Sequence, residues 1–181
     1  DLRFEHCVES LIVTNGRVTG CRGRLEGSED EFEAHGENVV IASGGINGNL
    51  ERVRQNCHAD WSRPPATLLN GSHKYADGKL HDAAAAHGAR ITHLDWQWNY
   101  AAGVHHWQPR KPSHGLSLVP PKSALWLNWR GERIGPMPLV TGFDTHDLVG
   151  QICRQERAYS WQLLNRRIML KELAISGGEF N

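Results

Sequence analysis

The sequence predicts an α+β fold that begins with a small antiparallel β-meander. Two β-branched runs lie on either side of Asn15-Gly16, a dipeptide that adopts the positive φ angles of a type I′ hairpin turn. A continuous apolar run at residues 39–42 ends at Ser43-Gly44-Gly45. Residues 77–94 then have the pattern of a capped helix followed by a strand. Strands and helices therefore alternate along the chain.

The meander is predicted within the first 38 residues. Residues 4–25 alternate and turn like the two strands of a hairpin. The stretch EGSEDEFEAHGEN that follows is acidic and contains glycine, and only Phe32 and Ala34 interrupt its polar character. We expect a loop with one short polar strand there, and this strand completes the meander.

A strand, a glycine turn and a short helix are predicted next. The run at residues 39–42 is apolar without alternation, which is typical of a strand buried on both faces, as in a parallel sheet. After the glycines, Leu50, Val53 and Cys57 share one face of a helix. Asn49 stands at the position of its N-cap.

A second region is expected after the proline-containing break at residues 62–66. Asp77 is a candidate N-cap for a helix rich in alanine, and Gly88 stands where the chain would leave that helix with positive φ. A strand is predicted at residues 90–94, directly after the glycine.

The last third of the chain is predicted to hold a short hairpin and two helices. Residues 123–134 have the pattern of a strand, a turn at Arg130-Gly131 and a return strand. Apolar residues then recur at helical spacing within residues 146–161 and again within residues 165–176.

Composition excludes several classes of partner. Lys plus Arg and Asp plus Glu number 20 each, so no net charge favours nucleic acid or an anionic membrane. No apolar stretch approaches the length of about 20 residues that spans a bilayer. The four cysteines form no CxxC pair, which argues against a zinc site or a disulfide framework. We expect a cytoplasmic protein with free thiols, no metal and no nucleic-acid partner.

The glycines after residue 42 are candidates for a nucleotide-cofactor site. In an open α/β sheet, ligands bind beyond the carboxyl ends of the strands, and glycines there let the backbone approach a ligand closely. Ser43-Gly44-Gly45 and Gly48 have this arrangement. The alternative is a tight turn in which the glycines serve only the backbone, and the chain has no GxGxxG or GxxxxGKS motif.

Aromatic residues offer a second candidate site, whereas the histidines do not. The eleven histidines lack the spacings of metal ligands, so we expect them to be solvated or hydrogen-bonded. A group of tryptophans with Tyr100 as a candidate proton donor suits a pocket for a flat apolar substrate, and the alternative is an aromatic core. The group comprises Trp96, Trp98, Tyr100, Trp107, Trp126, Trp129 and Trp161.

Taken in order, the stretches CVESLIVTNGRVTGCRG, VVIASGGINGN, DGKLHDAAAAHGARI and WQLLNRRIMLKELAISGGEFN resemble flavoproteins of the fumarate reductase and succinate dehydrogenase superfamily. This superfamily includes the 3-ketosteroid dehydrogenases. The resemblance covers nearly the whole chain. It implies an FAD-dependent oxidoreductase, a dehydrogenase or reductase of CH–CH type substrates, that transfers a hydride between a substrate carbon and flavin N5. It also implies a small apolar or flat organic substrate.

The resemblance implies which residues contact the cofactor. The family's hairpin and the end of its strand lie along FAD, and by position these contacts fall on Val8, Ala42, Ser43, Gly44 and Gly45. Asp77 matches the end of a T-G-D-G motif in which Tyr75-Ala76 replace Thr-Gly. Asp77 is therefore a flavin contact or only a helix cap. Tyr100 is the candidate catalytic residue.

The resemblance also divides the chain. Residues 1–49 are expected to be part of the FAD-binding domain, and residues 50–181 part of a substrate-binding cap domain. Because the family's GxGxxG motif is missing, the chain resembles an internal fragment of a longer flavoprotein, and FAD is expected in the full-length protein but not in this part alone. An aromatic-lined binding domain or a structural domain without redox activity is the alternative.

Overall fold

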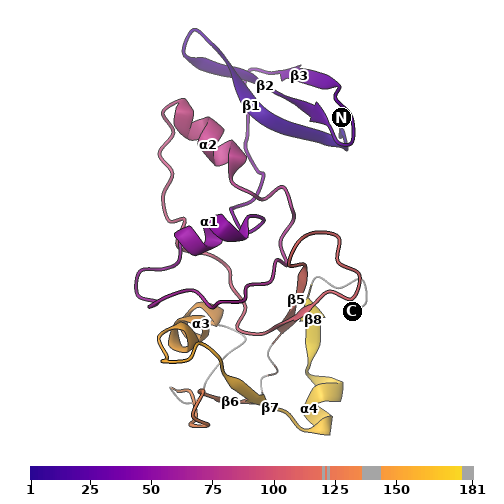
Figure 1. The fold of residues 1–181 in the computed structure, drawn as a ribbon. Coiled ribbons are helices and arrows are strands. Elements are labelled where there is room, and N and C mark those ends of the chain that lie inside the picture. Colours follow the sequence, from indigo (N-terminus) through magenta and orange to yellow (C-terminus); the bar gives the residue numbers. More distant parts are fainter. Residues whose placement is uncertain (120, 122, 136–143, 177–181) are drawn as a thin grey trace.

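The computed structural model describes residues 1–119, 121, 123–135 and 144–176. Figure 1 shows the β-meander at one end of the molecule, helices α1 and α2 in the middle, and two small sheets with helices α3 and α4 at the other end. The chain thus combines helices and antiparallel strands, as the α+β prediction requires. Helix α2 lies against strand β1 of the meander.

The meander forms as predicted. Strands β1 (His6–Thr14), β2 (Arg17–Leu25) and β3 (Glu31–His35) pair antiparallel in that order. The hairpin turns at Asn15 and Gly16, whose φ angles are 50° and 76°. Two successive positive φ angles match the twist of the paired strands, which is why Asn-Gly closes this hairpin. The prediction of a short polar strand in the acidic stretch is also confirmed.

Helix α1 (Leu50–Gln55) begins where the sequence predicts. The side chain of Asn49 accepts hydrogen bonds from the backbone N–H groups of Glu51 and Arg52, at 3.1 and 3.2 Å. These bonds satisfy donors that have no partner within the helix. Val53 is the buried residue of the helix.

The predicted parallel-sheet strand at residues 39–42 is not confirmed. Residues 38–45 form no strand, and the side chain of Val40 is 87% exposed. A strand buried on both faces needs a paired neighbour and covering layers. No strand among the described residues pairs with this segment, so its apolar side chains stay uncovered.

Helix α2 (Lys79–Ala86) begins one residue later than the predicted cap allows. The N-cap is Gly78, which has a φ of 83°, and Asp77 precedes it. The carboxylate of Asp77 accepts the backbone N–H of Lys79 at 3.0 Å, so Asp77 still satisfies one helix donor. Gly88 has a φ of 91° after the helix, as predicted. The strand predicted at residues 90–94 does not form.

Two small sheets and two helices make up the other end of the molecule. Strands β4, β5 and β8 form one antiparallel sheet in that order, and β6 pairs with β7. The strands are β4 (Gly103–His105), β5 (Gly115–Val119), β6 (Leu125–Leu127), β7 (Trp161–Leu163) and β8 (Ala174–Ser176). The helices are α3 (Thr145–Cys153) and α4 (Arg166–Lys171).

The predictions for this end are correct in part. The strand at residues 125–127 and the turn at Gly131, with a φ of 84°, form as predicted. The return strand is reduced to one bridge between Leu127 and Arg133, because β6 pairs instead with the distant β7. The last predicted helix is shorter than its pattern, since residues 174–176 leave it and pair with β5.

Helix α3 organises the core of this end. Leu148 and Ile152 pack with Trp126 and Ile134. Val149 and Cys153, on another face of α3, pack with Trp61, and Ala101 contacts both clusters. Trp61 and Trp126 are therefore core residues. Others in the predicted aromatic group are exposed by more than half of their surface, namely Trp96, Trp98, Trp107 and Trp161.

A close backbone approach joins the glycine loop to the segment before α2. The backbone N–H of Gly48 donates to the carbonyl of Ala76 at 2.8 Å, and the side chain of Asn70 donates to the carbonyl of Gly48 at 2.9 Å. A Cβ at position 48 would lie 2.5 Å from the carbonyl oxygen of His73 and 2.9 Å from that of Ala76. Only glycine fits between these carbonyls.

We therefore expect Gly48→Ala to destabilise the protein by about 1–3 kcal/mol, the usual penalty for forcing an extra methyl group into a packed site. The matched control is Gly45→Ala, because a Cβ at position 45 meets nothing within 4 Å. Denaturant unfolding monitored by tryptophan fluorescence measures the free energy of unfolding of both variants. Equal stability of the two variants would contradict the close approach.

Candidate functional site

The exposed loop at residues 42–45 is the first part of the candidate site. Gly44 has a φ of 81°, and a Cβ there would lie 3.1 Å from the Cβ of Ala76. The glycine at position 44 is thus explained by the chain's own conformation and packing. Gly45 differs, because no atom would lie within 4 Å of an added Cβ. Its open backbone is accessible to a ligand.

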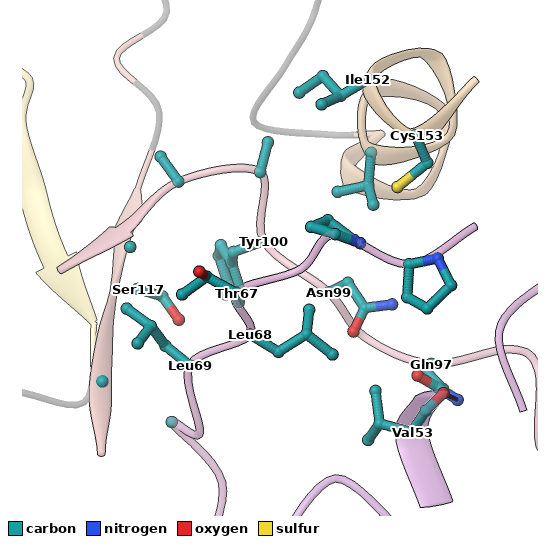
Figure 2. A pocket seen from close by; sticks show the side chains of 18 of the residues that line it. Val53, Thr67, Leu68, Leu69, Gln97, Asn99, Tyr100, Ser117, Ile152 and Cys153 are labelled. Atoms are coloured by element: carbon teal, nitrogen blue, oxygen red, sulfur yellow. Dashed lines mark hydrogen bonds between the residues drawn. The ribbon is translucent and has the colours of Figure 1, made fainter. Parts of the chain in front are cut away.

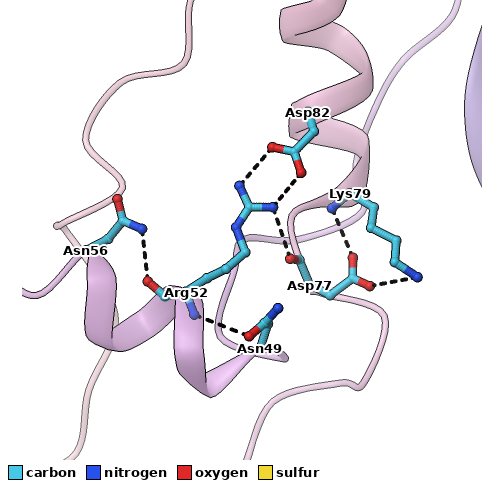
Figure 3. A network of polar contacts seen from close by, with 6 residues as sticks. All are labelled: Asn49, Arg52, Asn56, Asp77, Lys79 and Asp82. Carbon is cyan, nitrogen blue, oxygen red and sulfur yellow. Dashed lines mark hydrogen bonds and ion pairs between the residues drawn. The ribbon is translucent and has the colours of Figure 1, made fainter.

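The turn before α2 lies against this loop and is held by polar contacts (Figure 3). The carboxylate of Asp77 bonds to the backbone of Lys79 and lies 3.5 Å from its ammonium group. The guanidinium of Arg52 lies 3.5 Å from the carbonyl oxygen of Asp77 and forms two hydrogen bonds with Asp82. Helices α1 and α2 are therefore linked directly behind the turn.

Val8 lies on the meander, in β1, opposite Gly23. Its neighbour Cys7 lies within electrostatic reach of the turn before α2. Burial is the main cause that raises the pKa of the Cys7 thiol, and the charges of Glu9 and Asp77 raise it further, while that of Lys79 lowers it. The structure thus brings this part of β1 toward Asp77, although the two are far apart in the sequence.

A cavity of about 710 Å³ opens below the glycine loop (Figure 2). Its walls come from α1, α3, β5, and the loops at residues 64–72 and 97–103. Leu68, Leu69 and Ile152 provide apolar surface, and Tyr100 adds a hydroxyl group. Asp, Glu, Lys, Arg and His are all absent from its described lining residues. Apolar walls with a few polar groups are typical of small-molecule sites.

The two thiols in the cavity wall do not add charge. Burial, with a smaller contribution from the nearby Cys57, raises the pKa of Cys153 to about 11. Burial also raises the pKa of Cys57. Both thiols are therefore protonated near neutral pH, and all four cysteines of the chain are free. An ionised ligand would find no countercharge in this wall.

Asn47 connects the glycine loop with the cavity. It follows Gly45 by two residues, lines the cavity, and donates its side-chain N–H to the carbonyl of Trp98 at 3.4 Å. The rings of Trp98 and Tyr100 stack with centroids 6.5 Å apart, and both residues line the cavity. One lining residue of the cavity is thus two positions along the chain from the open backbone of Gly45.

Gln97 holds the aromatic segment in place. Its side-chain amide nitrogen lies within hydrogen-bond distance of the carbonyls of Val53 and Asn56 in or after α1, at 3.2 and 2.9 Å. It also contacts the carbonyl of Leu94 at 3.1 Å. Sequence reasoning missed Gln97, because a glutamine between two tryptophans carries no signal of these distant carbonyls.

The histidines engage aromatic rings and backbone groups. His146 stacks on Trp96 with ring centroids 4.9 Å apart, and His58 meets His146 edge-on at 5.0 Å. Among the described residues, no group of three or more His, Cys, Asp or Glu side chains is placed to hold a metal ion. In the same part of the chain, no helix has the length and apolarity to cross a membrane.

The sequence of the chain is similar to known FAD-binding proteins. The profile of the family described as FAD binding domain matches residues 1–180. A KsdD-like steroid dehydrogenase of Mycolicibacterium smegmatis is 40% identical over 189 residues, which cover 97% of this chain and 34% of that protein. A KsdD-like steroid dehydrogenase of Mycobacterium tuberculosis is 38% identical, with 97% of this chain and 33% of that protein covered. The chain spans about a third of the length of these relatives.

A stacked histidine pair closes the loop between β4 and β5, beside the cavity. The rings of His106 and His114 lie 4.1 Å apart and are nearly parallel. Each accepts a backbone N–H at Nδ1, from Gln108 and Arg110 respectively, at 2.9 and 3.1 Å. Burial, followed by the charges of His106, Lys111 and Arg110, lowers the pKa of His114 below its ordinary value of 6.5.

We expect this loop to lose stability in acid. Because the folded-state pKa of His114 is lowered, its contribution is fully present above pH 6.5 and declines as pH falls through the folded pKa. Protonation would place like charges on stacked rings and remove an Nδ1 acceptor. The measurement is the melting temperature against pH for wild type and His114→Gln, with the exposed His105→Gln as control. Parallel curves for wild type and His114→Gln would contradict this role.

Proposed function

This chain belongs to the family of the FAD binding domain, and on that premise we propose that it supplies one wall of the flavin site and the substrate cavity of an FAD-dependent oxidoreductase. The observation that carries the proposal is the position of Gly45. Its backbone is open to ligand, and it lies two residues before Asn47, which lines a cavity without charged residues in its described wall. A flavin on the loop would therefore face a substrate in the cavity.

The proposed flavin contacts come from two segments that the fold brings together. Ala42, Ser43, Gly44 and Gly45 are exposed, and the open backbone at Gly45 fits the close approach of a flat cofactor. The turn at Asp77 packs against this loop through Ala76, and its carboxylate bonds to the backbone of Lys79. Val8 is the proposed contact on the meander, next to Cys7, whose thiol is within electrostatic reach of Asp77 and Lys79.

The proposed reaction divides the chemistry between cofactor and protein. When bound, the flavin supplies the hydride acceptor or donor. The residues of this chain orient the two reactants and exclude water with apolar walls. Tyr100 is the proposed proton donor or acceptor, because it carries a hydroxyl group and lines the cavity.

The proposed substrate is a flat, uncharged organic molecule. Among the described lining residues there is no ionisable group that could pair with a carboxylate, and the thiols are protonated near neutral pH. An unpaired charge is costly in such surroundings. The matched relatives are named steroid dehydrogenases, and a steroid has this flat and apolar shape.

We further propose that residues 39–42 form their strand in the full-length protein. The run is apolar and exposed here, with Val40 uncovered, as expected of a sheet strand without its neighbours. Residues 1–49 would then belong to the FAD-binding domain and residues 50–181 to the cap domain. A cytoplasmic location remains a prediction from the sequence.

The full-length protein is expected to purify with bound FAD, and Gly45→Val to weaken FAD binding at least about tenfold, equivalent to about 1.4 kcal/mol. The valine side chain would occupy the space proposed for the cofactor. The control is Gly135→Val, since a Cβ there also meets nothing within 4 Å. Titration of the apoprotein with FAD measures both variants. The assignment of Gly45 to the flavin site would be contradicted if the full-length protein bound no FAD. It would also be contradicted if Gly45→Val and Gly135→Val bound FAD with equal affinity.

For catalysis, we expect Tyr100→Phe to lower kcat by about 100-fold or more, the usual contribution of a positioned proton donor or acceptor. Tyr159→Phe is the matched control, because Tyr159 also lines the cavity. Steady-state kinetics with a 3-ketosteroid and an artificial electron acceptor provides the measurement. The same assay is expected to show no turnover of a dicarboxylate such as succinate. A normal kcat for Tyr100→Phe would remove the role of this residue.

A further inference from the structure

We propose that Arg52 is a positioning residue of the flavin site, which fixes the Asp77-Gly78 peptide against the glycine loop. The inference rests on the proposed function, because it takes the loop and the turn as the two parts of the flavin wall. Arg52 is not itself a proposed flavin contact; it acts through the turn, which it contacts at Asp77 and Gly78. It comes from α1, whereas the turn precedes α2 (Figure 3).

The guanidinium of Arg52 binds Asp82 of α2 in a fixed orientation. Its two terminal nitrogens donate to the two carboxylate oxygens of Asp82 at 2.7 and 2.9 Å. This fork-to-fork geometry constrains both position and angle, which a lysine ammonium cannot do. The ion pair raises the pKa of Arg52 and lowers that of Asp82. The side chain of Arg52 is 22% exposed, so solvent reaches it only in part.

The same guanidinium lies directly over the turn. A Cβ on Gly78 would be 2.7 Å from Nη1 of Arg52 and 2.9 Å from a methyl carbon of Ile46. The arginine therefore occupies the space that a side chain at position 78 would need. Its Nη1 also lies 3.5 Å from the carbonyl oxygen of Asp77. On the other side of the turn, Ala76 packs against Gly44.

Arg52 is also held firmly at its own backbone. Its N–H donates to the side chain of the N-cap Asn49, and its carbonyl accepts from the side chain of Asn56 at 2.9 Å. Helix α1 has only six residues and follows the glycine loop directly. A displacement of the loop would therefore move Arg52, and Arg52 would move the turn. The two parts of the proposed flavin wall are thus connected by one side chain.

Arg54, also in helix α1, is a matched control, because it tests whether any arginine that ties α1 to a distant segment affects FAD binding. Arg54 also donates two hydrogen bonds, to the carbonyls of Pro65 and Ala66 at 2.8 and 2.7 Å. These carbonyls belong to the loop that includes the cavity-lining Pro65, and not to the turn at residues 76–78. Both arginines tie α1 to a distant segment, but only Arg52 touches the turn of Asp77-Gly78.

The experiment compares Arg52→Lys and Arg54→Lys in the full-length protein, with FAD as the probe. We expect Arg52→Lys to weaken FAD binding on the order of tenfold, because small misplacements of positioning groups can cost up to about 100-fold, and to change the visible circular dichroism of bound flavin. Arg54→Lys is expected to retain wild-type affinity and spectrum. The melting temperature of each apoprotein shows how much either substitution destabilises the protein itself, apart from its effect on FAD binding. Asp82→Asn serves as a second variant with the same expected loss.

The outcomes separate the two proposals. If wild type binds FAD and both Arg52→Lys and Asp82→Asn match Arg54→Lys in affinity and spectrum, the positioning role is wrong while the flavin site stands. If wild type binds no FAD, the proposed function and this inference are both wrong. A selective effect of Arg52→Lys and Asp82→Asn on FAD, beyond any shared loss of melting temperature, supports the inference.

Discussion

The close approach of two backbone segments, residues 44–48 and 73–78, is the constraint on which the rest of this structure depends. It requires glycine at position 48 and packs Ala76 against Gly44. Helix α1 starts directly after the first segment and α2 directly after the second, so the approach fixes the relation of the two helices. Asn70 extends the same contact toward β5, since its backbone bonds to Ser113 and Gly115.

This arrangement places two chemically different surfaces side by side. The loop at residues 42–45 presents exposed backbone, which suits the polar edges and the flat face of a flavin. The cavity presents apolar and neutral polar side chains, and its described lining includes no Asp, Glu, Lys, Arg or His. Asn47 belongs to both surfaces. The lack of charged residues in the described cavity wall is the basis on which we propose an uncharged substrate.

Local rules explain which features the sequence could predict. The Asn15-Gly16 turn, the Asn49 cap and the positive φ of Gly88 depend on neighbouring residues, and all three were predicted correctly. The strand at residues 39–42 was not, because a buried strand depends on neighbours far away in the chain. The contact between Arg52 and Asp82 spans 30 residues and has no local pattern. Two of the glycines, at positions 44 and 48, pack against the chain itself, which fits the alternative of a tight turn that the sequence also offered.

The candidate site shows the same division between local and long-range information. The resemblance supplied Val8, Ala42, Ser43, Gly44, Gly45, Asp77 and Tyr100 as candidates. The fold adds that Gly45 is open, that Tyr100 lines a cavity, and that Gln97 and Arg52 hold the segments in place. The most direct test is a crystal structure of the full-length protein with FAD. Our account predicts flavin atoms within about 4 Å of Gly45, the distance of van der Waals contact. Protein backbone packed over Gly45, with FAD bound elsewhere, would contradict it.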